Sequence, residues 1–169
     1  SGLFGLGDKH GKNLTITIPE NWVADNISVS AVSAPVQAEG LHARELHTDT
    51  ISGTIELSDI QAEKLALSST SARITCSGTA RNVTLDTVSG DCTLELTKTA
   101  EKIRMNSVSG NLEIVLPKKA GFTLDLDTVS GKFRSDFVFR TKDSGYTSGD
   151  GGCTINAGTV SGGVNIRQR

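Results

Sequence analysis

Hydroxyl groups at a fixed spacing are the most regular chemical feature of this sequence. The tetrapeptide Thr/Ser-Val/Ile-Ser-Gly occurs five times and ends at Gly53, Gly90, Gly110, Gly131 and Gly162. Two related segments end at Ala34 and Ala72. A serine directly precedes the final residue in every segment, and a threonine or serine stands three residues before it in nearly all of them. Such rows could bind the hydroxyls of a glycan, or they could hydrogen-bond only within the protein.

The glycan hypothesis defines a set of candidate binding residues. They are the serines and threonines of the tetrapeptides, to which we add the single tyrosine, in a polar segment before the last repeat: Ser52, Ser89, Ser109, Ser130, Ser161, Thr50, Thr87, Thr128 and Tyr146. The alternative is a structural ladder in which each hydroxyl bonds to its neighbours in adjacent repeats, and the Ser/Thr pattern favours this alternative.

Carboxylates form a second row, four residues before the final residue. This position holds Asp49, Asp86 and Asp127, with Ser68 and Asn106 in the intervening repeats. Oxygen ligands of this kind could bind Ca²⁺, the one cofactor that the sequence suggests. Asp and Asn next to Thr or Ser are also typical of chain corners, where they accept hydrogen bonds. Because the acids are not in adjacent repeats, the pattern favours corners over a metal site.

The remaining reactive side chains do not predict catalysis. Cys76 and Cys92 occupy core positions of the repeat and Cys153 ends the polar segment, without the Cys-x-x-Cys or histidine pairing of a zinc site. We therefore expect buried thiols. No nucleophile is paired with a base, so we expect a protein that is not an enzyme. A carbohydrate-active alternative would rest on Asp86 and Asp127, which would have to meet in a groove.

The repeat itself predicts the elements that position these rows. With the final Gly or Ala as position 0, positions −7, −5, −2, +2 and +4 are apolar except at Thr48, Thr70 and Ser135. This period of two is the strand period. A slip in the alternation at pairs such as Asp86-Thr87 predicts a corner there. Counting onward from that corner places positions −2 and 0 inward, and positions −3 and −1 outward.

Units of this length bury their apolar face only by stacking on one another. The sequence therefore predicts an all-β, single-domain parallel β-solenoid, β-helix-like, with about seven rungs of 18–21 residues, for which coil length suggests a right-handed turn. Within this one domain of residues 1–169, we expect an N-terminal cap and half rung at 1–26, regular rungs at 27–137, an inserted loop at 138–152 and a last rung at 153–169. The loop could fold over the C-terminal rung or bind a partner.

Composition narrows the partners. The net charge is −2 and basic residues are scattered, so we expect no nucleic acid partner. No apolar run is long enough for a membrane span, and the chain begins Ser-Gly without a Met. We expect that a membrane tether lies outside this sequence.

The repeated Thr-Val-Ser-Gly units, with the C-terminal "GTVSGGVNIRQR", resemble the bacterial putative-adhesin family of β-strand-repeat proteins, a domain of unknown function. The resemblance covers residues 12–169. It implies a non-enzymatic interaction or scaffold domain on the cell surface or the extracytoplasmic side of the bacterial envelope, whose partner is an unidentified envelope component, glycan or protein. A carbohydrate-binding or carbohydrate-active protein and a purely structural spacer are the alternatives.

Overall fold

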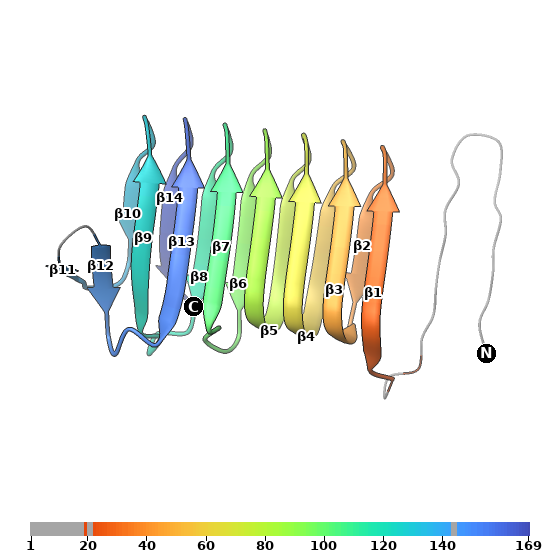
Figure 1. Ribbon diagram of the computed structural model, residues 1–169, viewed down its shortest axis with the longest axis horizontal. Helices are drawn as coiled ribbons and strands as arrows, with labels where there is room; N and C mark the ends of the chain where they lie inside the picture. The colour runs from red at the N-terminus through yellow and green to blue at the C-terminus, as the bar shows by residue number, and fades with distance from the viewer. Residues whose placement is uncertain (1–18, 20–21, 143–144) are drawn as a thin grey trace.

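The computed structural model describes residues 19, 22–142 and 145–169, and its regular elements there are fourteen strands joined in one curled sheet (Figure 1). The first layer contains β1 (Ala24–Ala31), β3 (His42–Thr50), β7 (Lys102–Ser107), β9 (Phe122–Thr128), β11 (Arg140–Lys142), β12 (Gly145–Ser148) and β13 (Cys153–Thr159). The second contains β2 (Val36–Glu39), β6 (Cys92–Leu96), β8 (Leu112–Leu116), β10 (Phe133–Ser135) and β14 (Val164–Gln168). Two long strands, β4 (Ile55–Ser69) and β5 (Ile74–Thr87), run through both layers. The predicted all-β class is confirmed.

Successive units pair in parallel and in register. Leu85 of β5 lies beside Met105 of β7, and Cys92 of β6 lies beside Leu112 of β8. Equivalent apolar positions therefore form continuous rows along the sheet, as stacked repeats require.

These rows fill the space between the two layers. Positions −7, −5, +2 and +4 point inward as predicted, and in the unit that ends its bend at Gly110 they are fully buried: Ile103, Met105, Leu112 and Ile114. Because the chain has few aromatic residues, Leu, Ile and Ala make up most of the core, and most of its bulk comes from Leu and Ile. Each such side chain contributes about 1.5–3 kcal/mol on burial.

The order of the units in space differs from their order along the chain. The last unit, β13 and β14, lies between its predecessors: β13 pairs with both β7 and β9, and β14 pairs with both β8 and β10. The unit of β9 and β10 is therefore the terminal one (Figure 1).

The inserted segment closes this terminal unit. Residues 138–152, expected as a loop, contain β11 and β12, and β12 pairs antiparallel with the outer edge of β9. Phe133, Phe139 and Tyr146 form an aromatic cluster with ring centroids 5.2–5.6 Å apart. Covering a strand edge in this way removes a site of unwanted strand pairing. The segment therefore covers the unit of β9 and β10, and not the C-terminal rung of residues 153–169 that one of the two alternatives named.

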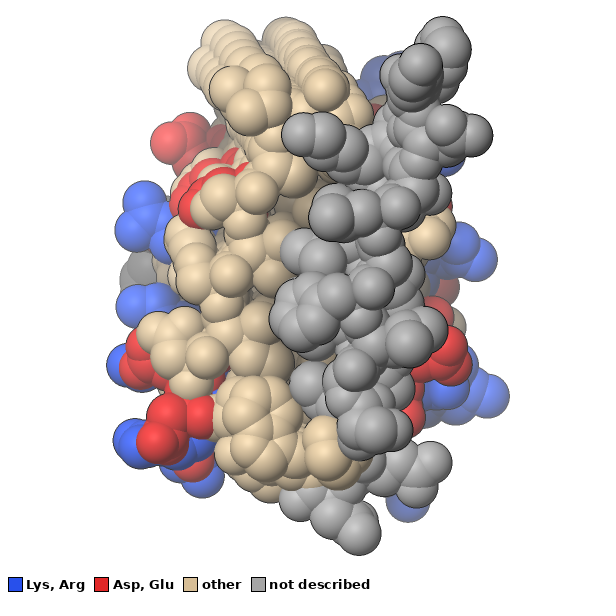
Figure 2. All heavy atoms as spheres, turned by 90° about the vertical axis from the view of Figure 1, so that its right-hand side faces the viewer, with Lys and Arg blue, Asp and Glu red and all other residues tan. Residues whose placement is uncertain are grey.

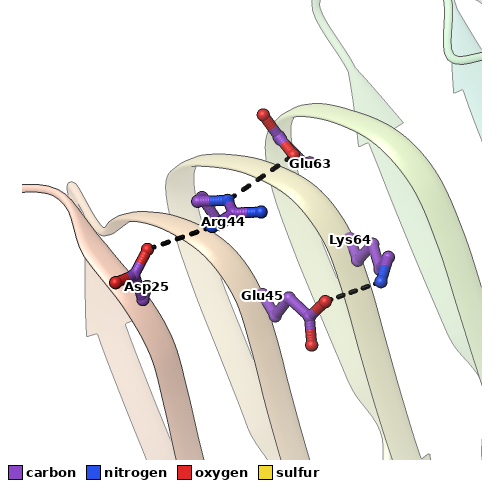
Figure 3. Close-up of polar contacts among 5 residues, drawn as sticks. All are labelled: Asp25, Arg44, Glu45, Glu63 and Lys64. Carbon is purple, nitrogen blue, oxygen red and sulfur yellow. Dashed lines mark hydrogen bonds and ion pairs between the residues drawn. The ribbon is translucent and has the colours of Figure 1, made fainter.

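At the other end, ion pairs join neighbouring units on the surface. Arg44 on β3 lies between Asp25 on β1 and Glu63 on β4, and Lys64 pairs with Glu45 at 2.6 Å (Figure 3). The hydrogen bond from Lys64 lowers the pKa of Glu45. Exposed pairs of this kind contribute little to stability, because water screens the two charges. Most of the predicted N-terminal half rung lies outside the described residues, and Trp22 near that end is half exposed.

Candidate interaction surface

The recurring tetrapeptide forms a tight bend that closes on itself by a hydrogen bond. The hydroxyl three residues before position 0 accepts the backbone N–H of position 0 in five units: from Gly53 to Thr50 (3.0 Å), Ala72 to Ser69 (2.9 Å), Gly110 to Ser107 (2.7 Å), Gly131 to Thr128 (2.8 Å) and Gly162 to Thr159 (3.1 Å). This is the turn that Ser and Thr side chains favour.

The structure corrects the prediction that this hydroxyl faces outward. Thr50 and Thr87 are 5% and 7% exposed, and Thr128 is half-buried. The alternation continues to the end of the strand instead of slipping at Asp86-Thr87, so position −3 points inward like −5 and −7. Thr50 and Thr128 close their bends by a hydrogen bond, whereas the buried hydroxyl of Thr87 has no partner among the described residues. Thr50 and Thr87 are not available to a ligand.

The serine before position 0 faces outward, as predicted for Ser52, Ser89, Ser109, Ser130 and Ser161. Its backbone N–H bonds to the carbonyl of position −2 in the neighbouring unit, as from Ser109 to Val88 (3.0 Å). In several units the hydroxyl contacts the same carbonyl, as from Ser52 to Val32 (3.3 Å) and from Ser130 to Val160 (3.1 Å). The row therefore has the bonding of the structural ladder.

Glycine at position 0 is explained by the approach of the neighbouring backbone. A Cβ added at Gly110 would lie 1.9 Å from the carbonyl oxygen of Gly90, and one added at Gly162 would lie 1.9 Å from that of Gly110. Neither glycine has a positive φ. These bends therefore need glycine because the backbone of the neighbouring unit lies so close.

The prediction that position −2 points into the core was wrong. The Val and Ile side chains at this position are 46–79% exposed, because the bend turns them away from both layers. The residues at this position follow one another along the sheet in the order Val32, Ile51, Thr70, Val88, Val108, Val160 and Val129. We call these seven residues the apex row.

The apex row carries no charge. In Figure 2 the bends form the tan upper edge of the described residues, and most charged side chains lie on the flanks. A contiguous apolar surface rimmed by polar groups is typical of a macromolecular contact site.

The candidate carboxylates stand apart from one another. Asp49 bonds to Ser68 and lies 2.5 Å from His47, and Asp86 accepts a hydrogen bond from Asn106 at 2.7 Å. Asp127 lies next to Gly158 in the register. In the described part of the chain, no three His, Cys, Asp or Glu side chains are grouped to hold a metal ion.

The three cysteines are buried and free, as predicted. Burial raises the pKa of Cys76 to about 12 and that of Cys153 to about 11. Burial, followed by the charges of Asp91 and Asp86, raises the pKa of Cys92 to about 12. Such thiols stay protonated and are poor nucleophiles. Tyr146, the remaining candidate, packs in the aromatic cluster and is half-buried.

Taken together, these features define an all-β repeat domain with a regular surface row. The chain belongs to the family described as Toastrack DUF4097, whose model matches residues 8–167. The expected resemblance to a bacterial domain family of unknown function is confirmed.

A solved structure supports the fold. The chain is similar to a putative cell adhesion protein from Clostridium sporogenes, with a TM-score of 0.60 and 10% sequence identity, over 90% of this chain and 96% of that one. No curated protein matches the chain. Among the described residues, no helix is long and apolar enough to cross a membrane.

Proposed function

We propose that this protein is a non-enzymatic interaction domain of the bacterial cell surface, which binds an envelope component through the apex row. The localisation draws support from the similarity to a putative cell adhesion protein, together with the family. The proposal includes a parallel β-solenoid of about seven rungs with a right-handed turn, and a membrane tether outside this sequence.

The exposure of the apex row carries the proposal. The other three positions of the tetrapeptide have structural roles, since the first hydroxyl and the serine make hydrogen bonds and the glycine accommodates a carbonyl. Position −2 makes only backbone hydrogen bonds to its neighbours, yet its side chain is Val or Ile in six of seven units. Thr70 occupies the seventh, so the fold accepts a hydroxyl there. Folding does not require six exposed apolar side chains in one line, whereas a binding surface does.

A binding assay with row variants tests the proposal. Val88→Ser, Val108→Ser and Val160→Ser together remove the middle of the apex row. We expect retention of the purified protein on envelope fractions of its own bacterium to fall about tenfold or more, because each lost apolar side chain weakens binding by about 1 kcal/mol or more. The melting temperature should change little, because exposed positions contribute little to stability.

The matched control removes exposed apolar surface elsewhere. Val23 and Val138 are 62% and 90% exposed and lie outside the row, so Val23→Ser with Val138→Ser should leave retention unchanged. Equal retention of the row variant and the wild type would show that the row is not the binding element. A wild-type protein that no envelope fraction retains would contradict the proposed function and leave the spacer alternative.

The proposal of no catalysis has its own test. Asp86 and Asp127 lie on strands separated by β7 and β13, and Asp86 is engaged by Asn106. We expect no cleavage of a panel of acidic polysaccharides, with or without Ca²⁺. Cleavage that Asp86→Ala or Asp127→Ala abolishes would establish the carbohydrate-active alternative instead.

A further inference from the structure

A hollow of about 320 Å³ lies beside the apex row, where the last unit is inserted next to the terminal one. Its lining comes from the bends that precede β10 and β14, from the residues just after those bends, and from one residue after the bend that precedes β8. These residues are Ser130, Gly131, Lys132, Arg134, Ser161, Gly162, Gly163, Asn165 and Asn111. Its lining has two cationic side chains and no carboxylate.

The hollow exists because a glycine interrupts a row of side chains. Gly163 stands between Asn111 and Lys132: its N–H donates to the side-chain oxygen of Asn111 (2.9 Å), and the N–H of Val164 donates to the carbonyl of Lys132 (2.8 Å). A Cβ at Gly163 would lie 3.2 Å from that Asn111 oxygen and 3.5 Å from the Lys132 carbonyl. Gly163 has no positive φ, so the bend does not require glycine at this position. Its missing side chain leaves space between two polar neighbours.

The nearest carboxylates already have partners. Asp91 accepts two hydrogen bonds from Asn111 (2.9 and 3.0 Å), and Glu113 accepts one from Arg167 (2.8 Å), which raises the pKa of Arg167. Lys132 and Arg134 are exposed and form no ion pair within the described ranges, unlike Arg44 and Lys64 at the other end.

The available groups of the hollow are mainly hydrogen-bond donors. The side chains of Lys132 and Arg134 donate only, and the hydroxyl of Ser161 and the amide of Asn165 make no hydrogen bond to another described residue and can also donate. A guanidinium beside an ammonium suits an oxyanion, to which Arg can donate two parallel bonds. Hydroxyl and amide groups beside them suit the hydroxyls of a sugar.

We propose that this hollow, which we call the basic hollow, binds one acidic sugar residue of an envelope polysaccharide, with Lys132 and Arg134 holding its carboxylate and with Ser161 and Asn165 contacting its hydroxyls. Its volume is at the lower end of the range for ligand sites, which fits a single ring. The basic hollow is a second site beside the apex row and does not depend on it: the carboxylate recognises charge, whereas the row recognises apolar surface.

Calorimetry with defined probes tests this assignment. We expect trigalacturonate to bind the full chain at low ionic strength and maltotriose, its neutral counterpart, not to bind. Affinity for trigalacturonate should fall as salt is added, because the ionic contacts are exposed and screened. Lys132→Ala with Arg134→Ala should weaken binding about tenfold or more, since each charge-assisted contact is lost.

Two further variants distinguish binding at the basic hollow from nonspecific attraction to positive charge. Lys118→Ala with Lys119→Ala removes two exposed cations at a distant bend and should leave affinity unchanged. Gly163→Ala narrows the basic hollow without changing charge and should weaken binding at an unchanged melting temperature. Serine variants of the apex row should bind trigalacturonate normally, so that failure of one site is distinguished from failure of the other.

Three outcomes would overturn the proposal. They are no binding of trigalacturonate at low salt, equal weakening by the Lys118/Lys119 control, and inorganic phosphate binding as tightly as the sugar acid. The last would show a site for any small anion.

Discussion

The two kinds of bend in this molecule differ in how strictly they repeat. The bends at the apex row have the same length in every unit, and backbone hydrogen bonds join neighbouring bends, with serine hydroxyls adding contacts in several units. The bends on the opposite side vary. β4 and β5 run straight through theirs, residues 97–101 and 117–121 form short loops in other units, and residues 138–152 form the insertion.

Backbone conformation separates the two sides as well. The described residues with positive φ are Gly40, Asp59 and Gly78 on the opposite side, and Gly149 and Gly151 in the insertion. None lies in an apex bend. The apex bends are regular because each contacts the bends of neighbouring units, whereas the shape of each opposite bend depends on the conformation of its own residues. Evolution could therefore insert an edge-covering segment on the opposite side without disturbing the row.

The largest expected effect comes from placing a methyl group at each kind of bend. Gly110→Ala puts a Cβ 1.9 Å from the carbonyl oxygen of Gly90, which forces two units apart. We expect a loss of more than about 3 kcal/mol in the free energy of unfolding. Gly40→Ala meets no atom within 4 Å but must keep a φ of 65°, and should cost about 1–2 kcal/mol. Urea unfolding of both variants makes the comparison, and similar losses would contradict it.

A buried thiol lies beside each kind of bend, and its titration tests the core that they share. Cys92 follows the apex bend that ends at Gly90, and Cys153 begins β13 after the insertion. Below pH 9 the thiols are protonated in both folded and unfolded protein. Above pH 9 the unfolded chain loses these protons while the folded chain holds them to a pKa of about 11 or 12, so stability falls with rising pH.

The expected slope between pH 9 and 11 is about 1.4 kcal/mol per pH unit for each thiol. Replacing Cys92 or Cys153 by Ala should flatten the slope of unfolding free energy against pH, although each variant starts from a lower stability. A slope unchanged in both variants would show that the thiols ionise equally in the folded and unfolded states.

A smaller effect is expected from removing one hydroxyl from an apex bend and one from an opposite bend. Ser107→Ala leaves the buried N–H of Gly110 without its 2.7 Å partner and should cost about 1–2 kcal/mol. Thr97, in an opposite bend, donates to the carbonyl of Gly78 at 3.2 Å but is exposed. Thr97→Ala should therefore cost less than about 0.5 kcal/mol, because water replaces the lost contact. A larger fall in melting temperature for Thr97→Ala than for Ser107→Ala would contradict the proposed difference between the two kinds of bend.

A gain in stability, and not a loss, is expected from replacing a single buried hydroxyl away from both kinds of bend. Thr48, an exception to the apolar pattern, is fully buried between Val29 and Leu67 of the neighbouring strands, and its hydroxyl contacts no polar partner among the described residues. Thr48→Val keeps the shape and should stabilise the fold by about 1 kcal/mol. Destabilisation would indicate that the hydroxyl is hydrogen-bonded in solution.

Several features could be predicted from the residues alone. The alternation around each glycine identified the strands and the buried positions such as Leu85 and Ile114, because side chains of a strand alternate between its faces. It also placed the serine row outward and indicated that units stack. It did not reveal the basic hollow, which depends on Gly163 lying between two side chains that are distant in sequence.

The residues alone therefore predict the local structure: the strands, their period, the repeat and its small residue. The tertiary structure sets which way the bend turns Val108 and its equivalents, because counting positions assumes an extended chain, and a bend closed by a hydroxyl does not preserve that count. It also decided that the last unit lies inside the stack, since chain order does not prescribe which neighbours a strand pairs with. Both the apex row and the basic hollow depend on the direction of the bend and on the position of the last unit in the stack.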